Sequence, residues 1–203
     1  ETIPINGISG FTSNPKICSH LHLAIQSGDD DILKAMNRKY TVSHCEDLVK
    51  KVRQARSEMA ITTDVIVGFP GETKSQFNNT VKLFKRLKFD LVYISQYSPR
   101  YGTASYLLKD NVSSLEKKRR EEVLDTLLKK EALLKTKKYI GKEIKVLVEG
   151  INKRGKYYGK TSSYQTVLIE NNKNKKDCLL GHFVIVKIKE ALPFALSGEL
   201  VQD

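Results

Sequence analysis

The strongest constraint on the fold is the stretch AITTDVIVGFPGET at residues 60–73. Its near-continuous apolar run from Ile61 to Val67 predicts a strand that is covered on both faces. A Gly-Pro-Gly turn follows, and Thr73 forms with Gln76 a T-x-x-Q pattern that caps the start of a helix. A buried strand that enters a helix through a tight loop is the junction at which α/β proteins place ligands.

Further strands and helices extend this junction into a parallel α/β run. The alternation at residues 20–25 and the run FDLVYISQY at 89–97 predict two more strands. Apolar residues at steps of three and four predict helices at 44–57 and 77–87, and the S-x-x-E pattern at Ser43 predicts the cap of the first. Strands in such a run are parallel, so the loops that follow them emerge at one edge of the sheet.

Three polar loops follow the predicted strands and are therefore expected to meet at that edge. They are Gln26-Ser27-Gly28, GFPGET at 68–73 and Ser98-Pro99-Arg100. The small residues of GFPGET let backbone approach a ligand, and the helix start can serve an anionic or polar group. An ordinary tight connection explains this loop equally well, and GFPGET lacks the Gly-Lys-Ser/Thr of a P-loop.

Side chains near this edge leave alternatives open. Asp64 lies inside the apolar strand, so we expect a buried carboxylate that is either a structural hydrogen-bond anchor or a functional acid. Arg100 either holds a carboxylate or phosphate or faces solvent. His20 and His22 share one strand face, and without a third ligand the pattern favours packed or hydrogen-bonded histidines over a metal pair.

A long helix is predicted from Leu115 to about Tyr139. Leucines and valine supply one face, and the other is mostly charged, including the run KKRR at 117–120. A solvated face with salt bridges is favoured over a phosphate-binding face.

From residue 141 the character of the chain changes. Short strands are predicted at 142–149, 156–160, 165–170 and 183–189, a spacing that indicates a small all-β barrel or sandwich. The region is basic with interleaved tyrosines, and the whole chain has a net charge of +12, which suits single-stranded or looped RNA. The candidate RNA-binding residues are Lys145, Arg154, Lys156, Tyr158 and Lys160. The expected domains are therefore residues 1–139 and 140–203.

The three cysteines, Cys18, Cys45 and Cys178, form no CxxC or CxxxCxxC pattern. The chain thus carries no complete cysteine frame for zinc or an iron–sulfur cluster, and free thiols in a reducing cytosol indicate a cytoplasmic protein. No apolar run approaches the roughly 20 residues of a membrane span, and the first residues lack the pattern of a signal peptide. The chain does not begin with Met, so we expect a fragment or a processed product.

Several long stretches in order resemble the MiaB-type tRNA methylthiotransferases of the radical S-adenosylmethionine superfamily. They are HLHLAIQSGDDDILKAMNRKYT at 20–41, AITTDVIVGFPGET at 60–73, FDLVYISQYSPRYGT at 89–103 and YIGKEIKVLVEG at 139–150. The terminal GHFVIVKIKEALPFALSGEL resembles the end of the TRAM domain, a small RNA-binding β-barrel. The resemblance implies a partial TIM-like barrel with parallel strands, followed by a TRAM barrel.

Some segments of the family have no counterpart in this chain. The N-terminal cluster-binding domain and the CxxxCxxC loop have no counterpart in the chain, and GISGFTSNPKICS looks like a truncated barrel strand and helix. Ala24 and Tyr101 stand where the family usually has Pro. The chain is therefore expected to be the C-terminal half of the barrel plus the TRAM domain, and to be inactive by itself.

For the intact enzyme, the resemblance implies transfer of a methylthio group to C2 of a modified adenosine at position 37 of tRNA. A reduced cluster cleaves S-adenosylmethionine to a radical, a second [4Fe–4S] cluster delivers sulfur, and a second S-adenosylmethionine supplies the methyl group. The QSG sequence indicates a tRNA substrate over a ribosomal protein, with isopentenyladenosine and threonylcarbamoyladenosine both open. The expected partner is the tRNA anticodon stem-loop, and the protein is expected to be a monomer.

The resemblance also assigns the cofactor-binding residues, while no catalytic residue is assigned. They are Gln26, Ser27, Gly28, Asp64, Gly68, Pro70, Gly71, Glu72 and Arg100. Arg100 is the candidate for the cofactor carboxylate or a tRNA phosphate. The alternative function is a non-catalytic RNA-binding module on a degenerate barrel; an unrelated TIM-like lyase or aldolase would need a Lys or metal triad that is not evident.

Overall fold

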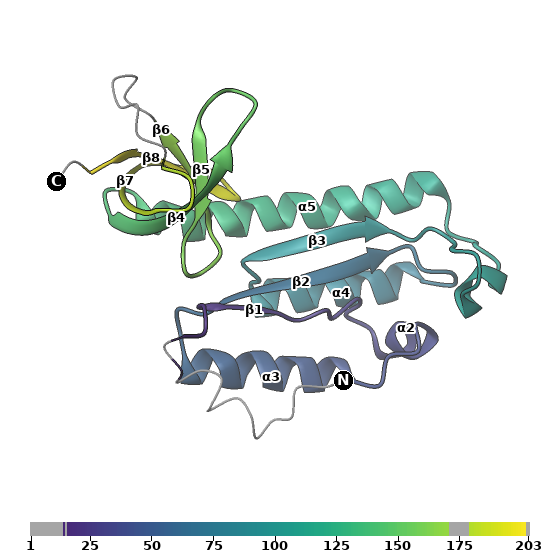
Figure 1. Ribbon diagram of the computed structural model, residues 1–203. Helices are drawn as coiled ribbons and strands as arrows, with labels where there is room; N and C mark the ends of the chain where they lie inside the picture. The colour runs from purple at the N-terminus through teal and green to yellow at the C-terminus, as the bar shows by residue number, and fades with distance from the viewer. Residues whose placement is uncertain (1–13, 15, 171–178, 202–203) are drawn as a thin grey trace. The chain divides into compact units, whose positions relative to one another are not determined.

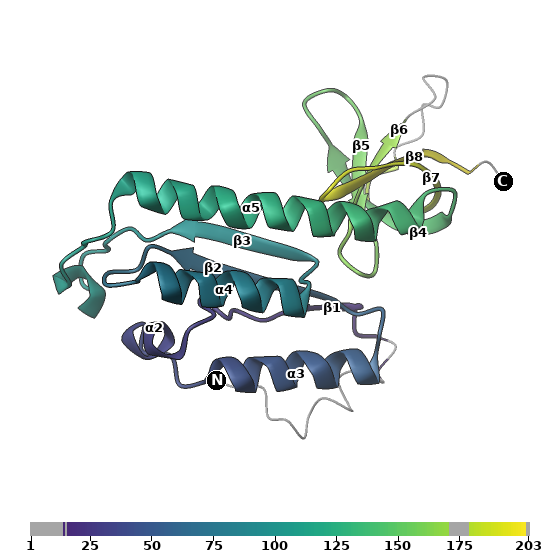
Figure 2. The same cartoon turned by 180° about the vertical axis from the view of Figure 1, so that it is seen from behind.

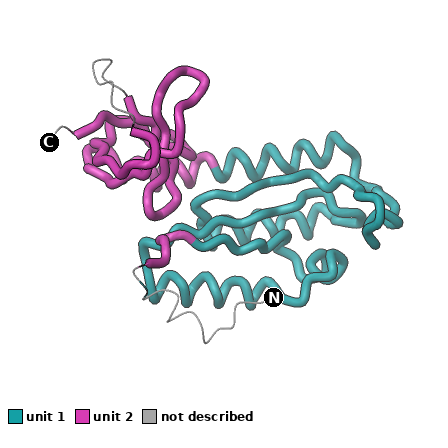
Figure 3. Tube along the Cα trace, in the orientation of Figure 1, with its two compact units in different colours: residues 1–14, 21–128 teal, residues 15–20, 129–203 magenta. Residues whose placement is uncertain are grey.

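The computed structural model describes residues 14, 16–170 and 179–201. The chain divides into two compact units, residues 1–14 with 21–128 and residues 15–20 with 129–203 (Figure 3). This division falls within a helix near residue 128, so the expected domain boundary at 139/140 stays a prediction. Cys178 and most of the GISGFTSNPKICS stretch at residues 7–19 lie outside the described residues.

The first unit is built on a three-stranded sheet in the order β1 (His20–His22), β2 (Ala60–Val67), β3 (Leu91–Gln96). β2 and β3 are parallel, and an isolated parallel bridge joins Gln26 to Val65. The strand expected at 20–25 is thus shorter than predicted, because beyond His22 the chain keeps only scattered contacts with β2. The parallel α/β class is confirmed.

Three helices connect these strands: α2 (Asp30–Ala35), α3 (Val42–Ala55) and α4 (Lys74–Leu87). Figures 1 and 2 show α4 lying alongside β2 and β3. Phe77, Leu83 and Phe84 of α4 are buried, and the Phe84 ring meets that of Phe89 edge-on at 5.2 Å. The apolar positions spaced by three and four residues therefore do face a core, as their period requires.

The helix caps confirm one prediction and correct another. Thr73 caps α4: its hydroxyl accepts from the Gln76 amide at 3.2 Å, and the Gln76 side chain accepts from the Thr73 amide at 3.0 Å. The predicted cap at Ser43 is wrong, because Thr41 caps α3 by accepting from the His44 amide at 3.2 Å. Val42 therefore already has helical backbone, and Ser43 lies within the first turn.

After β3 the chain forms the 3₁₀ helix η2 (Ala104–Leu107), the long helix α5 (Ser114–Thr136) and a short 3₁₀ turn η3 (Lys137–Tyr139). The predicted long helix is confirmed. Its buried positions up to residue 128 are Lys117, Arg120, Leu124 and Leu128, which follow one another at steps of three and four. Two cations thus occupy the apolar stripe of this helix.

The second unit contains a closed barrel in the order β4–β5–β6–β8–β7. The strands are β4 (Glu143–Ile151), β5 (Tyr157–Lys160), β6 (Thr166–Glu170), β7 (Phe183–Ala191) and β8 (Ala195–Leu200). Val and Ile side chains alternate into its core, together with Leu196. The choice between barrel and sandwich is thus resolved in favour of the barrel. β8 was not predicted, because ALSGEL lacks a β-branched run; it pairs parallel to β6 and antiparallel to β7.

Close backbone approach in the barrel depends on glycine at position 159. A Cβ placed there would lie 2.1 Å from the Leu147 carbonyl oxygen on the neighbouring strand. We expect Gly159→Ala to lower the free energy of unfolding by about 1–3 kcal/mol, because the strands must separate to admit the methyl group. The matched control Ser162→Ala, in an exposed turn, should change it by less than about 0.5 kcal/mol. Denaturant unfolding measures both, and equal effects would contradict the account.

Candidate functional site

A cavity of about 590 Å³ lies at the edge of the sheet to which the parallel strands point. Its walls come from β2 and β3 near their ends, the segment after β1, the end of α2 and the segment after β3. The residues that line it include Gln26, Met36, Arg38, Asp64, Ile66, Phe69, Ser95, Gln96, Tyr97, Arg100 and Ser105. The structure therefore brings together Gln26, Asp64 and Arg100 from three separate predicted segments.

Gln26 is held in an uncommon backbone conformation beside this cavity. Its φ is 70°, a left-handed value that costs a non-glycine residue free energy. Its amide donates to the Asp64 carbonyl at 2.9 Å, and its carbonyl accepts from the Ile66 amide at 3.0 Å. These two hydrogen bonds hold the Gln26 backbone against β2, and the Gln26 residue is buried there.

Ser27 and Gly28 are not among the residues that line the cavity, and Gly28 packs against α4. The Gly28 amide donates to the Thr80 hydroxyl at 2.9 Å, and a Cβ on Gly28 would lie 2.5 Å from the Thr80 Cα. The Ser27 hydroxyl accepts from the Asp29 amide at 3.3 Å, and the Asn79 amide group donates to the Asp29 carboxylate at 2.9 Å. The contacts of this loop thus dock the end of the first strand on α4.

The expectation that Asp64 is buried is wrong. Its side chain is 41% exposed, because it lines the cavity rather than the core. Its carboxylate lies 3.3 Å from Nε2 of His22, whose Nδ1 lies 2.9 Å from the Thr62 hydroxyl. The favoured prediction of a hydrogen-bonded His22 agrees with these contacts.

The turn after β2 is closed by a buried carboxylate, that of Glu72. Its Oε2 accepts from the Gly68 amide at 2.7 Å, and its own amide donates to the Phe69 carbonyl at 2.9 Å. Gly68 and Gly71 both have positive φ, 70° and 84°, which a side chain would strain. Phe69 lines the cavity, whereas Gly68, Pro70, Gly71 and Glu72 do not. The four residues predicted to bind the cofactor that do not line the cavity therefore determine the conformation of the loop.

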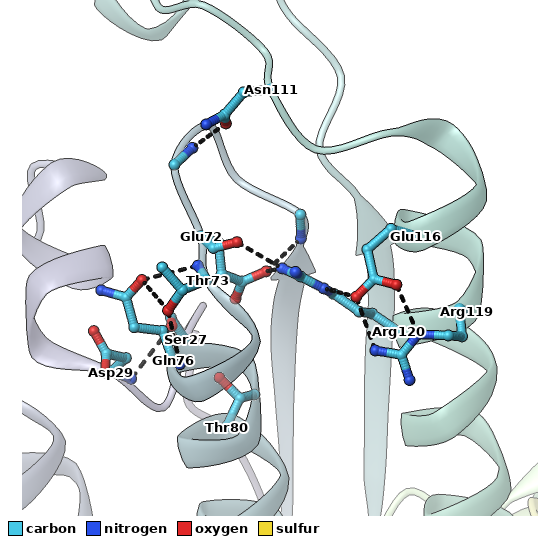
Figure 4. Close-up of polar contacts among 12 residues, drawn as sticks. Ser27, Asp29, Glu72, Thr73, Gln76, Thr80, Asn111, Glu116, Arg119 and Arg120 are labelled. Atoms are coloured by element: carbon cyan, nitrogen blue, oxygen red, sulfur yellow. Dashed lines mark hydrogen bonds and ion pairs between the residues drawn. The ribbon is translucent and has the colours of Figure 1, made fainter.

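Arg120 of α5 neutralises Glu72 inside the protein (Figure 4). Its Nη1 donates to the Glu72 carboxylate at 2.6 Å and to the Glu72 carbonyl at 3.1 Å, and its Nε donates to Glu116 at 2.9 Å. The two side chains are only 3% and 1% exposed. Burial raises the pKa of the Glu72 carboxyl, and the Gly68 amide and the Arg120 guanidinium oppose that rise.

Lys117 fixes the same loop and the segment after β3. Its aliphatic stem packs on Gly68, where a Cβ would lie 2.4 Å from the lysine Cγ. Its Nζ donates to the Tyr97 carbonyl at 3.1 Å and to Asp110 at 2.6 Å. The favoured prediction of a solvated face at 117–120 is therefore wrong for Lys117 and Arg120. Lys117 and Arg120 share one helix face with Leu124 and Leu128, at steps of three and four residues. This spacing is the sequence signal from which their burial could have been predicted.

Within the described residues, no group of three or more His, Cys, Asp and Glu side chains is placed to hold a metal ion. Cys18 is exposed, and Cys45 is buried in α3, where burial raises the pKa of its thiol to about 11. Such a thiol stays protonated at neutral pH and is a poor metal ligand. The described residues do not fit an iron–sulfur cluster.

On the barrel, the predicted RNA-binding residues differ in exposure. Lys145, Arg154 and Lys156 are exposed, whereas Tyr158 and Lys160 are half-buried. The Lys145 Nζ lies 4.6 Å from the Phe183 ring centroid, and the Lys160 Nζ lies 4.4 Å from that of Tyr164.

Phe183 and Tyr164 are therefore exposed rings beside cations, at 63% and 49% exposure. Tyr164 is one of the interleaved tyrosines on which the RNA-binding prediction rests, although not one of the candidate residues, whereas Phe183 was left out altogether. An aromatic residue at an outward-facing strand position is the signal that identifies Phe183.

Two family models match the chain, the radical SAM superfamily at residues 13–84 and the TRAM domain at residues 137–201. A protein of Methanocaldococcus jannaschii named "Probable threonylcarbamoyladenosine tRNA methylthiotransferase" is 42% identical over 93% of the chain. The chain belongs to the radical SAM methylthiotransferase family. Its relatives also include the tRNA-2-methylthio-N(6)-dimethylallyladenosine synthase of Bacillus subtilis, 40% identical over 92% of the chain.

The chain spans 41% and 36% of the lengths of these two relatives. Among solved structures, the coproporphyrinogen III oxidase HemN of Escherichia coli, a radical SAM enzyme, matches 65% of the chain and 31% of its own with a TM-score of 0.55. At 18% identity this likeness concerns the fold alone. None of the described helices is long and apolar enough to cross a membrane.

Replacement of Arg120 should measure how much its ion pair with Glu72 contributes to the stability of the fold. Arg120→Met leaves Glu72 buried without a countercharge, so we expect a loss of about 3–5 kcal/mol in the free energy of unfolding. Arg119→Met is the matched control: Arg119 is half-exposed, forms an ion pair with Glu116 and lies 6.0 Å from the Phe77 ring centroid, so its loss should cost under about 1 kcal/mol.

A second variant separates charge from packing in the same experiment. Glu72→Gln combined with Arg120→Met removes both charges and keeps an acceptor for the Gly68 amide, so it should recover part of the loss. Urea unfolding measures all three proteins. An Arg120→Met protein as stable as the Arg119→Met control would contradict the account.

Glu116 gives the stability a dependence on pH. Hydrogen bonds from Arg119 and Arg120 lower the pKa of its carboxyl to about 2, below the ordinary value of 4.5. A lowered pKa in the folded state contributes stability above the unfolded value, and that stability is lost as pH falls toward 2. The stability difference between the wild type and Glu116→Gln should therefore be largest near pH 7 and shrink between pH 4.5 and 2. Unfolding measured across this range tests it, and a difference that grows in acid would be the wrong sign.

Proposed function

We propose that the protein to which this chain belongs is a tRNA methylthiotransferase. It adds a methylthio group to C2 of a modified adenosine at position 37, in the anticodon stem-loop. The observation that carries the proposal is the cavity at the sheet edge, bordered by Gln26, Asp64 and Arg100, in a chain whose relatives are named for this reaction. The relatives include one named for each modified adenosine, so isopentenyladenosine and threonylcarbamoyladenosine are both candidate substrates.

S-adenosylmethionine is the proposed ligand of the cavity. It carries a carboxylate, an ammonium group, a ribose and an adenine, and the cavity offers partners for the two charged groups and for the adenine. Arg100 supplies a cation for the carboxylate or for a tRNA phosphate, Asp64 an anion, and Phe69 an aromatic surface. The remaining predicted residues are proposed to hold the surrounding loops in shape. They are Ser27, Gly28, Gly68, Pro70, Gly71 and Glu72.

The chain's own contribution to the reaction is to bind and orient the cofactor and the RNA. Two [4Fe–4S] clusters are proposed for the whole protein, with ligands outside the described residues. The three-stranded sheet is proposed to form part of a TIM-like barrel that further strands complete. The barrel formed by β4 to β8 is proposed to hold the tRNA stem through Lys145, Arg154, Lys156, Tyr158 and Lys160. We further propose a cytoplasmic monomer.

The assay that tests the activity uses the full-length gene product, reconstituted with iron and sulfide and supplied with S-adenosylmethionine and a low-potential reductant such as dithionite. It is offered two tRNAs, one with isopentenyladenosine and one with threonylcarbamoyladenosine at position 37, and nucleosides are analysed by mass spectrometry. We expect a methylthio product from one of them, and no product from the 203-residue chain alone. RNA binding without product from either tRNA would reject the enzyme and favour the RNA-binding module.

The salt dependence of tRNA binding tests the barrel. Each phosphate contact contributes about 0.7–0.9 to the slope of log affinity against log salt. Lys145→Ala and Lys156→Ala should each weaken binding and flatten that slope by about one contact. Lys50→Ala, an exposed lysine on α3, is the control and should leave the slope unchanged. Filter binding between low and moderate salt measures the slope. Equal slopes for all the proteins would show that these lysines of the barrel do not contact the tRNA.

A further inference from the structure

An aromatic pair stands exposed beside the cavity, on the segment that follows β3. Tyr101 is 91% exposed and Tyr106 is 46% exposed, and their ring centroids lie 5.7 Å apart at an interplanar angle of 78°. Arg100, Thr103 and Ser105 of the same segment line the cavity. The two rings are therefore immediate neighbours, in the chain, of residues that form the cavity wall.

The segment at 98–111 is held in place by hydrogen bonds at several points. The Tyr97 hydroxyl donates to the Ser105 carbonyl at 2.8 Å, and the Thr103 hydroxyl donates to the Arg100 carbonyl at 2.7 Å. The 3₁₀ helix η2 continues from this turn, with the Tyr106 amide donating to the Thr103 carbonyl at 3.0 Å. The exposure of the two tyrosines is thus imposed by a bonded turn.

The far end of the segment is anchored as well. Asp110 receives the buried Lys117 ammonium at 2.6 Å, and Asn111 accepts from the Gly71 amide at 2.7 Å. These bonds join the segment to α5 and to the turn after β2. The pairing with Lys117 also offsets the Asp110 charge, so that Arg100 and the exposed Lys109 give the segment its net positive charge.

A large exposed aromatic surface on a bonded turn indicates a binding role. The chain carries a net charge of +12, and Arg38 and Arg100 both line the neighbouring cavity, so the charge favours a polyanion over an acidic or neutral protein surface. Nucleic-acid bases stack on aromatic side chains, and unpaired loop bases are the ones free to do so. The occupant that fits both charge and shape is an unpaired base of RNA.

We propose that Tyr101 and Tyr106 form a stacking platform for an unpaired base next to the target nucleotide at the cavity mouth. This inference rests on the proposed function in one respect, the RNA substrate. The platform orients the loop of the RNA at the cavity mouth, and it selects for unpaired neighbours over a base-paired stem.

The test uses the full-length protein and a stem-loop RNA that carries the fluorescent base 2-aminopurine on either side of the target adenosine. Stacking on a ring quenches this base. We expect quenching on binding to the wild type, and Tyr101→Ala should remove it and weaken binding about five- to hundredfold, as expected for the loss of one stacked base. Tyr101→Phe keeps the ring and should bind within about twofold of the wild type. Tyr93→Ala, an exposed ring of β3 outside the cavity lining, is the matched control and should leave quenching intact.

Each result decides the proposal. Unchanged affinity and quenching in Tyr101→Ala and in the double variant with Tyr106→Ala would overturn it. Unchanged RNA binding together with altered self-association or loss of a protein contact would assign the rings to a protein partner and also overturn it. Circular dichroism should show that the variants are folded, because Tyr101 lies in solvent.

Failure of the platform and failure of the enzyme can be told apart. Methylthio product with no effect of Tyr101→Ala would reject the platform alone. Loss of quenching in Tyr101→Ala without product from either tRNA would support the platform and reject the enzyme.

Discussion

The buried ion pair between Glu72 and Arg120 is the interaction on which the functional edge of this protein depends. One carboxylate accepts both the Gly68 amide and the Arg120 guanidinium, so it closes the turn after β2 and at the same time ties that turn to α5. Neither charge is exposed to water, and each is stable inside the protein only because of the other. The stem of Lys117 covers Gly68 from the same helix and carries the connection on to the segment after β3. A helix far along the chain therefore sets the shape of the loop that borders the cavity.

The same edge concentrates backbone conformations that other parts of a protein avoid. Gln26 has a left-handed backbone held by two bonds to β2, and Gly68 and Gly71 take positive φ values in the turn. Gly28 admits the backbone of α4 where a side chain would not fit. Strained conformations of this kind persist where surrounding contacts determine them, and they cluster at ligand sites. The loops thus act as a framework, and the side chains of Gln26, Asp64, Phe69 and Arg100 line the cavity that the framework leaves.

Local patterns predicted the features that depend on local chemistry. The Thr73 capping box and the strand at Ala60–Val67 follow from residues close together in the chain, and the order of strands and helices predicted that the loops after them meet at one edge. Contacts across long separations were not visible. Arg120 looked like a surface charge because its partner lies 48 positions away, and Asp64 looked buried because the sequence gives no sign of the cavity that exposes it. β8 was not predicted because ALSGEL lacks a β-branched run. Its Gly198 allows a close approach of the neighbouring backbone and adds no side chain to the pattern.

The central claim is that the cavity at this edge binds S-adenosylmethionine, with Arg120 and Glu72 holding its wall. The most direct measurement is a crystal structure of the reconstituted full-length protein with S-adenosylmethionine. The account predicts the ligand in the cavity, with a polar group within hydrogen-bond distance of Gln26, Asp64 or Arg100, and with the Gly68 amide still bonded to Glu72. A ligand bound elsewhere, with this cavity holding only water, would contradict it.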